Sequence, residues 1–252
     1  MTAFDLQGNT AVVTGASRGL GRAMALALAQ AGADVACLSS RPGGTDETAA
    51  AIRATGRQAW SFAADLSDRG AVRQCAKDVF ETVGQVDILV NNAGTIRRHP
   101  AAEYPMEDWD AVVEINLNAM FLLCQLFAGP MIERNAGKIV NVASLLSFQG
   151  GITVPAYAAS KHGVAGLTKA LANEWASYGI QINAIAPGYF RTDNTQALQD
   201  NPDREPAIRS RIPAGRWGDP SDLGGAIVFL ASSASDYVNG HVLVVDGGWM
   251  AR

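Results

Sequence analysis

Charge and histidine are scarce in this chain of 252 residues. Charged residues make up 17% of the sequence and the formal net charge is −4, which argues against a nucleic-acid-binding surface. The three histidines, His99, His162 and His241, are isolated from one another. A metal site needs several ligands around one ion, so we expect surface or loop positions for the histidines and no metal.

Cysteine is equally scarce. The three cysteines, Cys37, Cys75 and Cys124, are an odd number without metal-like spacing, and all lie in apolar stretches. We therefore expect buried free thiols, because free cysteine is among the most buried residue types. Free thiols suit a reducing cytoplasm.

No segment of the sequence predicts a secretory signal or a membrane span. The first ten residues contain neither a basic region nor an apolar one. The richest apolar stretch, residues 119–132, is interrupted by Gln125 and Pro130, so we expect it to be too short to cross a bilayer. The expectation is a cytoplasmic protein without a membrane partner.

Hydrophobic residues are abundant, at 48%, and fall in short runs that alternate with longer Ala-rich stretches of helical period. Unbroken apolar runs are typical of strands covered on both faces, and seven such runs are Ala11–Thr14, Asp34–Ser39, Ala59–Ala63, Ile88–Asn91, Lys138–Val142, Gln181–Ala186 and Val242–Val245. Helices are predicted over Leu20–Ala31, Ala49–Ala54, Gly70–Val83, Trp109–Glu133, Ala156–Ser177 and Leu223–Ala231. The alternation predicts one α/β domain over residues 1–252, a Rossmann-type, doubly wound parallel sheet of about seven strands with helices on both faces.

One segment breaks this alternation. Residues 187–220 follow the sixth predicted strand and are polar and rich in proline and arginine. A long segment of this kind in a compact domain is usually a functional loop or lid. We expect it to contribute to a substrate site.

A glycine-rich turn follows the first predicted strand. Gly15, Gly19 and Gly21 form the pattern G-x-x-x-G-x-G and open the first predicted helix. Glycines allow a tight turn and a close approach to a pyrophosphate, which the free N–H groups of a helix amino end then bind. The alternative is an ordinary strand–helix turn, but the position after the first strand of an α/β chain favours a dinucleotide site.

A tyrosine and a lysine then stand four residues apart. Tyr157 and Lys161 share one face of a predicted helix. Free tyrosine, with a pKa near 10, is a poor base at neutral pH, but a nearby ammonium favours the phenolate. The pair is therefore suited to general acid–base chemistry on a carbonyl or alcohol. Taken alone, such a pair is more often a surface contact.

The glycine turn, Asn91-Asn92-Ala93-Gly94, Asn116, Ser144, Tyr157-x-x-x-Lys161 and Pro187-Gly188 occur in the order found in one family. This order resembles the short-chain dehydrogenase/reductase family, over nearly the whole chain from about residue 6 to residue 248. The resemblance implies hydride transfer between NAD or NADP and a carbonyl or alcohol, and a homotetramer. It also implies a catalytic group in which Ser144 binds the substrate oxygen, Asn116 holds a proton-relaying water, and Lys161 binds the nicotinamide ribose beside Tyr157.

The resemblance also implies a set of cofactor-binding residues, which are Gly15, Ser17, Arg18, Gly19, Leu20, Gly21, Ser39, Ser40, Arg41, Asp65, Leu66, Asn92, Ala93, Gly94, Tyr157, Lys161, Pro187, Gly188 and Thr192. The second strand ends without the acid that usually holds the ribose in NAD enzymes. Arg18 and Arg41 suit a 2′-phosphate and favour NADP, whereas sugar-acid relatives often use NAD without that acid. Both cofactors stay open.

Asp65 carries two interpretations. It follows the third predicted strand, and the resemblance places it on the adenine ring. The alternative is an N-cap for the next helix, a role that Ser67 or Asp68 would serve equally well. The first interpretation is the one we favour.

Two arginines follow Gly94 directly, at the sheet edge where ligands of α/β folds bind. Arg97 and Arg98 predict either a carboxylate site or a solvated basic loop. Residues 145–151, 211–218 and 235–240 resemble the sugar-acid branch of the family, which favours the first. The expected substrate-binding residues are Arg97, Arg98, Ser144, Gln149 and Tyr157.

Three functions are compatible with these sequence features. The leading one is hydride transfer with a six-carbon keto or hydroxy sugar acid of uronate breakdown. A 3-oxoacyl carrier-protein reductase would need a basic docking surface, and the mild acidity gives it little support. A cofactor sensor or scaffold without catalysis would be expected to lack part of the catalytic group, all of which is present.

Overall fold

The centre of the computed structural model, which describes residues 3–252, is a sheet of seven strands in the order β3-β2-β1-β4-β5-β6-β7. The strands are β1 Thr10–Thr14, β2 Asp34–Ser39, β3 Ala59–Ala63, β4 Ile88–Asn91, β5 Gly137–Val142, β6 Ile180–Pro187 and β7 Val242–Val245. All neighbouring strands run parallel. The chain starts at the centre, runs out to β3, and returns through β4, which confirms the predicted doubly wound sheet.

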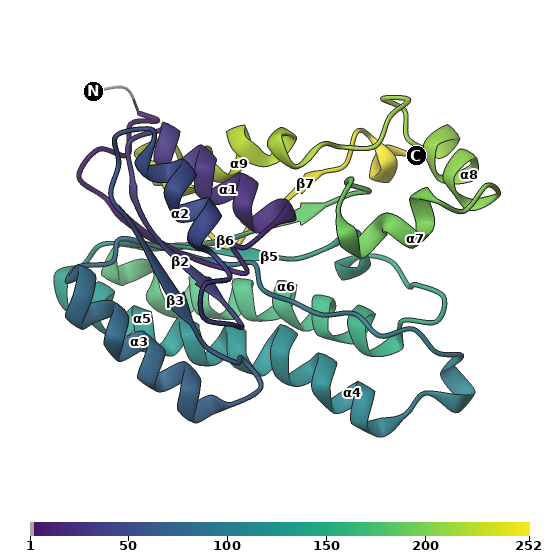
Figure 1. Cartoon of the computed structure of the whole chain (residues 1–252), viewed down its shortest axis with the longest axis horizontal. Helices are drawn as coiled ribbons and strands as arrows, with labels where there is room; N and C mark the ends of the chain where they lie inside the picture. Colours follow the sequence, from purple (N-terminus) through teal and green to yellow (C-terminus); the bar gives the residue numbers. More distant parts are fainter. Residues whose placement is uncertain (1–2) are drawn as a thin grey trace.

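Helices cover both faces of the sheet (Figure 1). One face carries α1 Gly19–Gln30, α2 Asp46–Arg53 and α9 Gly224–Ala231, and the other carries α3 Arg69–Val83, α4 Met106–Val113, α5 Ala119–Arg134 and α6 Pro155–Trp175. Val12 packs into one layer and Val13 into the other, and both are almost fully buried. Burial on both faces explains the unbroken apolar runs in the sequence.

The long helix before β5 differs from its prediction. A π-helical turn, Glu114–Asn118, joins α4 to α5, so the helix is continuous over Met106–Arg134 for 29 residues. By length and composition it is apolar enough to cross a membrane, and the expectation that this stretch is too short was wrong. Gln125 is exposed on its outer side and Pro130 lies near its end, so neither interrupts it. Half of its most apolar window is buried inside the protein, as in a core helix.

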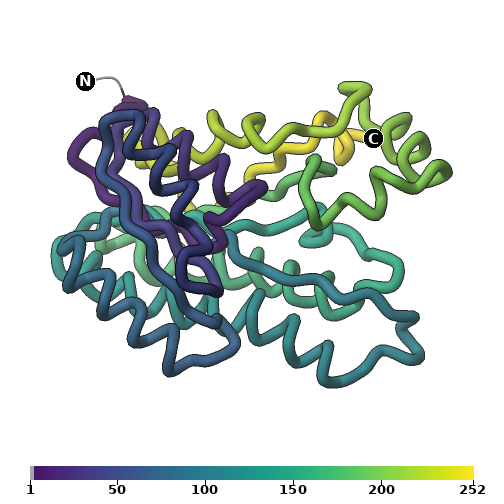
Figure 2. The backbone as a smooth tube through the Cα atoms, viewed as in Figure 1, coloured from purple at the N-terminus to yellow at the C-terminus, as the bar shows by residue number. Residues whose placement is uncertain are grey.

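The segment predicted as a long loop is partly helical. It contains η5 Asp193–Thr195, α7 Gln196–Gln199 and α8 Arg204–Arg211. Ile208 and Ile212 anchor it in a small apolar cluster with Trp217 and Trp249. Figure 2 shows this segment in green beside the yellow final residues of the chain. We call residues 188–219 the lid segment.

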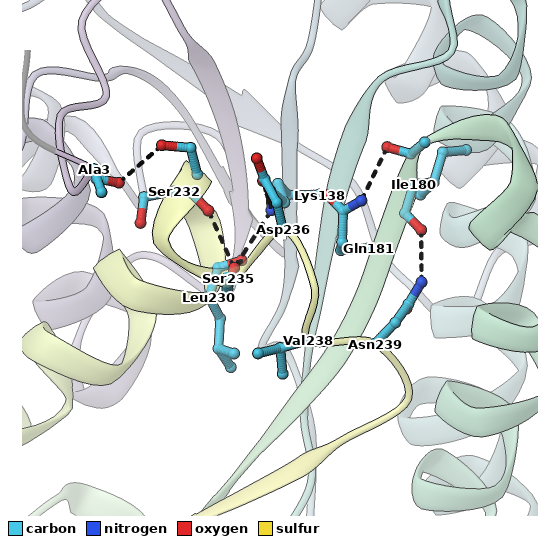
Figure 3. Close-up of polar contacts among 12 residues, drawn as sticks. Ala3, Lys138, Ile180, Gln181, Leu230, Ser232, Ser235, Asp236, Val238 and Asn239 are labelled. Atoms are coloured by element: carbon cyan, nitrogen blue, oxygen red, sulfur yellow. Dashed lines mark hydrogen bonds and ion pairs between the residues drawn. The ribbon is translucent and has the colours of Figure 1, made fainter.

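A polar network holds the amino ends of β5 and β6 (Figure 3). Lys138 Nζ donates to Asp236 Oδ1 at 2.7 Å, and Asn239 Nδ2 donates to the carbonyl of Ile180 at 3.0 Å. The amide of Ile182 donates to Asn239 Oδ1 at 2.7 Å. Residues 235–240, which suggested the sugar-acid branch, therefore hold β7 against β6 at the end of the sheet opposite Ser144.

The three cysteines are free and buried, as expected. Burial raises the pKa of the Cys37 and Cys124 thiols to about 12, and that of Cys75 to about 11. Within residues 3–252 no group of three His, Cys, Asp or Glu side chains is placed to hold a metal.

Candidate active site

The predicted site residues gather at the carboxyl edge of the sheet. Most of them lie at or just after the ends of six strands, and Tyr157 and Lys161 lie on α6. The strand-end segments are residues 15–21 after β1, 39–41 at β2, 65–66 after β3, 92–98 after β4, 144–149 after β5 and 187–192 at β6. β1 and β4 are neighbours in the sheet. The connection after β1 leads to β2 on one side, and the connection after β4 leads to β5 on the other side. Ligands of doubly wound sheets bind in the crevice at this point.

The turn between β1 and α1 requires its glycines. Gly15 has φ +65°, and a Cβ on Gly21 would lie 2.2 Å from the carbonyl oxygen of Gly15. Arg18 precedes α1 in an extended conformation, and no side chain within the described residues caps the helix. The first N–H groups of α1 thus remain available, and the cradle fits a pyrophosphate.

Asn92 and Thr14 fasten the end of β4 to this turn. Thr14 Oγ1 accepts from the amides of Asn92 and Ala93, both at 3.0 Å, and Asn92 Nδ2 donates to the carbonyl of Thr14 at 2.9 Å. Thr14 was not singled out from the sequence, although its place just before Gly15 was a signal. These bonds fix the crevice between β1 and β4.

The residues expected near the adenosine end differ in exposure. Ser39 is buried and its hydroxyl donates to the carbonyl of Arg41 at 2.9 Å, while Ser40 and Arg41 are exposed. Arg18 is also exposed and lies 3.1 Å from Asp193 of the lid segment. One of the arginines that suit a 2′-phosphate is thus paired within the protein.

Asp65 does not cap α3. Its Oδ1 accepts from the amide and hydroxyl of Ser67, at 2.9 and 2.8 Å, and these bonds lower the pKa of Asp65. Asp68 caps α3 instead, accepting from the amides of Gly70 and Ala71. Of the two interpretations of Asp65, the cap at this helix is wrong because Asp68 fills that position.

Ser144 and Tyr157 meet at the end of β5. The Ser144 side chain lies near enough to Tyr157 to lower its pKa, and Ser144 Oγ accepts from the amide of Leu146 at 3.1 Å. Burial raises the pKa of Tyr157, while Ser144 and the positive charge of Arg98 act in the opposite direction. Ser147, missed in the sequence, donates to the carbonyl of Lys161 at 2.6 Å and ties this turn to α6.

Lys161 is a buried cation. It is 4% exposed, and its Nζ donates to the carbonyl of Val142 at 2.6 Å. Burial lowers the pKa of Lys161 to about 8. Its Nζ is 5.6 Å from the centre of the Tyr157 ring, so a positive charge lies close to the phenol.

Asn116 lies in the π-helical turn and is 2% exposed. Its Oδ1 accepts from the amide of Thr95 at 2.8 Å, and its Nδ2 donates to the carbonyl of Thr95 at 2.9 Å and to Ser160 Oγ at 3.2 Å. The side chain therefore clamps the loop after β4 to α6. Gly94 leaves room for it, because a Cβ there would lie 3.2 Å from Asn116 Oδ1.

The two adjacent arginines point to different partners. Arg97 Nε lies 3.4 Å from Asp108 Oδ1, and the other oxygen of Asp108 is 2.7 Å from His99 Nε2. Arg98 is near enough to Tyr157 to favour its phenolate, and makes a long 3.4 Å contact with the carbonyl of Asn194 in the lid segment. Of the two arginines, Arg98 is therefore the one whose charge acts on Tyr157.

Comparison with known proteins fits this geometry. The model of the family described as short chain dehydrogenase matches residues 9–203. The chain belongs to the short-chain dehydrogenase family. It is 55% identical to the 2-dehydro-3-deoxy-D-gluconate 5-dehydrogenase of Bacillus subtilis (strain 168), over 99% of this chain and 98% of that protein.

Two solved structures extend the comparison. A candidate 2-deoxy-D-gluconate 3-dehydrogenase from Agrobacterium tumefaciens, with bound NADP, superposes with a TM-score of 0.94 at 53% identity over 100% of both chains. A gluconate 5-dehydrogenase from Burkholderia cenocepacia J2315, in complex with NADP and tartrate, gives a TM-score of 0.96 at 41% identity over 99% of this chain and 98% of that one. These likenesses confirm the α/β fold.

This short-chain dehydrogenase has the parts that proton transfer requires. Tyr157 supplies an ionisable hydroxyl, Ser144 a second hydroxyl near it, and Lys161 a positive charge 5.6 Å from the centre of its ring. Their positions depend on Ser147 and Asn116, which tie the turn after β5 and the loop after β4 to α6. A polar site held at this rigidity keeps its donors aimed without reorganisation.

Proposed function

We propose that this short-chain dehydrogenase transfers a hydride between NAD or NADP and a six-carbon keto or hydroxy sugar acid, in the manner of 2-dehydro-3-deoxy-D-gluconate 5-dehydrogenase. The names of the relatives support the substrate class. The observation that carries the proposal is the positive charge of Arg98, which acts on Tyr157, whereas its neighbour Arg97 is paired with Asp108. A gluconate 5-dehydrogenase is the nearest alternative.

The crevice fits a dinucleotide. The amino end of α1 and the glycine turn would hold the pyrophosphate, and Asn92 to Gly94 would line the crevice beside it. Arg18 and Arg41 would bind the 2′-phosphate of NADP. NAD has no 2′-phosphate, so its binding would leave the ion pair between Arg18 and Asp193 intact. When bound, the nicotinamide supplies or accepts the hydride.

Tyr157 would move the proton. In the direction of reduction its hydroxyl donates to the oxygen that becomes the alcohol, and burial keeps the phenol protonated at neutral pH by raising its pKa. Ser144 donates a hydrogen bond to the same oxygen. Lys161 would stabilise the phenolate that remains, since a positive charge in a pocket of low dielectric favours the anionic form.

Arg98 would bind the carboxylate of the sugar acid. Guanidinium and carboxylate form paired charge-assisted hydrogen bonds. Arg98 has one long contact, to Asn194, whereas Arg97 is held by Asp108. An acid bound at Arg98 would lie near Tyr157 and near the lid segment. Its contact with Arg98 would then help to orient both the substrate and the lid segment.

We also propose a homotetramer in the cytoplasm. A groove between α3 and α5 has an apolar floor with a charged rim, and its residues are Arg73, Ala76, Lys77, Phe80, Glu81 and Leu126. Apolar surface of this kind on two long helices supports a contact between copies. The buried free thiols support a reducing compartment. Light scattering on the purified protein tests the assembly.

The test of function is the absorbance of reduced nicotinamide with purified enzyme, both cofactors, and three substrates. These are 2,5-diketo-3-deoxygluconate, 5-ketogluconate and an acetoacetyl thioester. Fastest turnover of the first supports the proposal, and fastest turnover of the second favours gluconate 5-dehydrogenase. Turnover of the thioester alone would instead indicate a carrier-protein reductase, and turnover of none would favour a sensor or scaffold.

A further inference from the structure

The segment after β7 folds back onto the active-site turn and the lid segment together. Trp249 is 6% exposed within the apolar cluster of Ile208, Ile212 and Trp217. Asp246 holds the backbone turn around Trp249, because its two carboxylate oxygens accept from the amides of Gly248 and Met250, each at 2.8 Å. The indole is thus placed by its own local turn.

Two side chains pack against the indole of Trp249. The guanidinium carbon of Arg211, on α8, lies 4.0 Å from the centre of the Trp249 ring, and the Tyr189 ring centre is 4.6 Å away. A guanidinium over an indole face and a neighbouring aromatic ring both restrict the tilt of the indole. The indole N–H is therefore held in one direction, which is toward the side chain of Gln149.

Trp249 Nε1 donates to Gln149 Oε1 at 3.3 Å. Gln149 is five residues beyond Ser144 and its own amide donates to the carbonyl of Leu145 at 3.0 Å, so its backbone belongs to the catalytic turn. A glutamine amide has an accepting oxygen and a donating NH2, and an indole N–H can only donate. The amide oxygen must therefore turn to Trp249, and the NH2 turns the other way.

We propose that Trp249 is a positioning residue that fixes the Gln149 amide so that its NH2 group donates to an oxygen of the bound sugar acid. This rests on the proposed function, because it takes Gln149 to line the substrate pocket. Within residues 3–252 the NH2 of Gln149 has no hydrogen-bond partner, so its two donors are unused. A carboxylate or hydroxyl oxygen is the chemistry that would accept from them.

The test is steady-state kinetics of the full enzyme with the sugar acid that it turns over fastest. Trp249→Phe keeps an aromatic ring in the cluster and removes the N–H together with the five-membered ring of the indole. Without that donor the Gln149 amide is free to rotate, and we expect KM to rise about three- to ten-fold while kcat stays within about two-fold, as for the loss of one neutral hydrogen bond.

Trp217→Phe is the matched control. Trp217 belongs to the same cluster and is 1% exposed, but no atom of the described residues accepts from its indole nitrogen. Losing that N–H removes no bond, so KM should stay at the wild-type value. A KM rise in both variants would mean that packing, not the hydrogen bond, is at work, and would overturn the proposal.

A double-variant cycle supplies the second test. If Trp249 acts only through Gln149, Trp249→Phe will raise KM in the wild-type background and leave it unchanged in a Gln149→Ala background. Gln149→Glu keeps an acceptor for the indole but offers an anionic oxygen to the substrate, so KM should rise more than in Gln149→Ala. An unchanged KM in Trp249→Phe overturns this inference alone, while a wild-type enzyme inactive on every sugar acid overturns the proposed function.

Discussion

Polar side chains that hold the amino ends of β5 and β6 are paired closely within the protein, whereas some groups at the carboxyl ends are not. Asn239 binds β6 through both ends of its amide, at 2.7 and 3.0 Å. Arg98, at the other edge, has a single long contact of 3.4 Å, and the amino end of α1 has no side-chain cap. The amino edge is built for stability, and the carboxyl edge keeps donors free for a ligand.

The two lysines of these edges show the same contrast. Lys138 donates to Asp236, an anion, whereas Lys161 donates to the neutral carbonyl of Val142. Burial lowers the pKa of both, but Asp236 counteracts the change at Lys138. A buried cation without a counter-ion destabilises the fold. Lys161 therefore lowers the stability of the protein, and a role in function would account for its presence.

Replacing the hydroxyl at the centre of the carboxyl edge should have the largest effect. Tyr157→Phe removes the acid–base group, so kcat on the sugar acid should fall about 10²- to 10⁴-fold, as when general acid–base catalysis is lost. The ring still fills its place, so the thermal midpoint should stay close to the wild-type value. Cofactor turnover combined with a melting curve checks both, and a kcat within ten-fold of wild type would remove Tyr157 from the mechanism.

The pair of adjacent arginines offers the next largest contrast. Arg98→Gln should lower kcat/KM for the sugar acid about 10- to 100-fold, the scale of a lost charged hydrogen bond. Arg97→Gln breaks only a half-exposed contact with Asp108 and should change it less than about three-fold. An uncharged ketone serves as the reference substrate. Equal losses for both variants on the acid would mean that the carboxylate binds elsewhere.

A change at the amino edge should affect stability without affecting kinetics. Asn239→Ala removes two hydrogen bonds to β6 and leaves the carbonyl of Ile180 and the amide of Ile182 without that partner. We expect the free energy of unfolding to fall by about 2 kcal/mol, from about 1 kcal/mol for each bond. Urea unfolding measures this, and kcat/KM at low temperature should match wild type. A specific rise in KM would show that residues 235–240 do reach the substrate.

The sequence predicted the strands well, because burial on both faces of a parallel sheet leaves unbroken apolar runs. Predicted and observed bounds agree at β2, β3 and β4 and differ at β1 by a single residue, Thr10. It also predicted Tyr157 and Lys161 as a pair, since residues four apart along a helix share one face. Ser144 joined them only through the resemblance to the short-chain dehydrogenase/reductase family, because no local spacing links the turn after β5 to α6.

Contacts between distant segments were beyond the sequence. Nothing local distinguishes Arg97 from Arg98, because Asp108 on α4 makes the difference. Gln149 meets Trp249 across a separation of 100 residues. The helices of the lid segment were missed because its outer residues are polar, and their apolar side is supplied by only a few residues such as Ile208. In each case the deciding partner comes from another element of the fold.

The two lysines should also differ in how they couple stability to pH. The pKa of Lys161 is about 8 in the folded chain against 10.5 in a free side chain, so above pH 8 the unfolded state binds more protons and stability rises with pH. Between pH 8 and 9 the contribution of Lys161 should grow by about 1 kcal/mol, measured as the change in the stability difference between wild type and Lys161→Met.

The buried thiols make this difference the quantity to measure. Their raised pKa values lower stability as the pH approaches and passes their usual 9.0, but they do so equally in wild type and in Lys161→Met, so their effect cancels in the difference. Lys138→Met is the control, and should lose less of the rise because Asp236 favours the ammonium there. Identical pH profiles for wild type and Lys161→Met would mean that Lys161 is better solvated than its 4% exposure indicates.

The smallest effect should be found at the rim of the carboxyl edge, where Arg18 is paired with Asp193 at 3.1 Å. Both side chains are more than 70% exposed, so the pair is weak. A 2′-phosphate would compete with Asp193 for the guanidinium, whereas NAD brings no competing group. Asp193→Asn should therefore lower KM for NADP about two- to five-fold and leave KM for NAD unchanged. Glu205→Gln, which breaks another exposed pair of the lid segment, should change neither. A parallel change with both cofactors would show that Asp193 acts on the lid segment itself, because only a direct competition for Arg18 separates NADP from NAD.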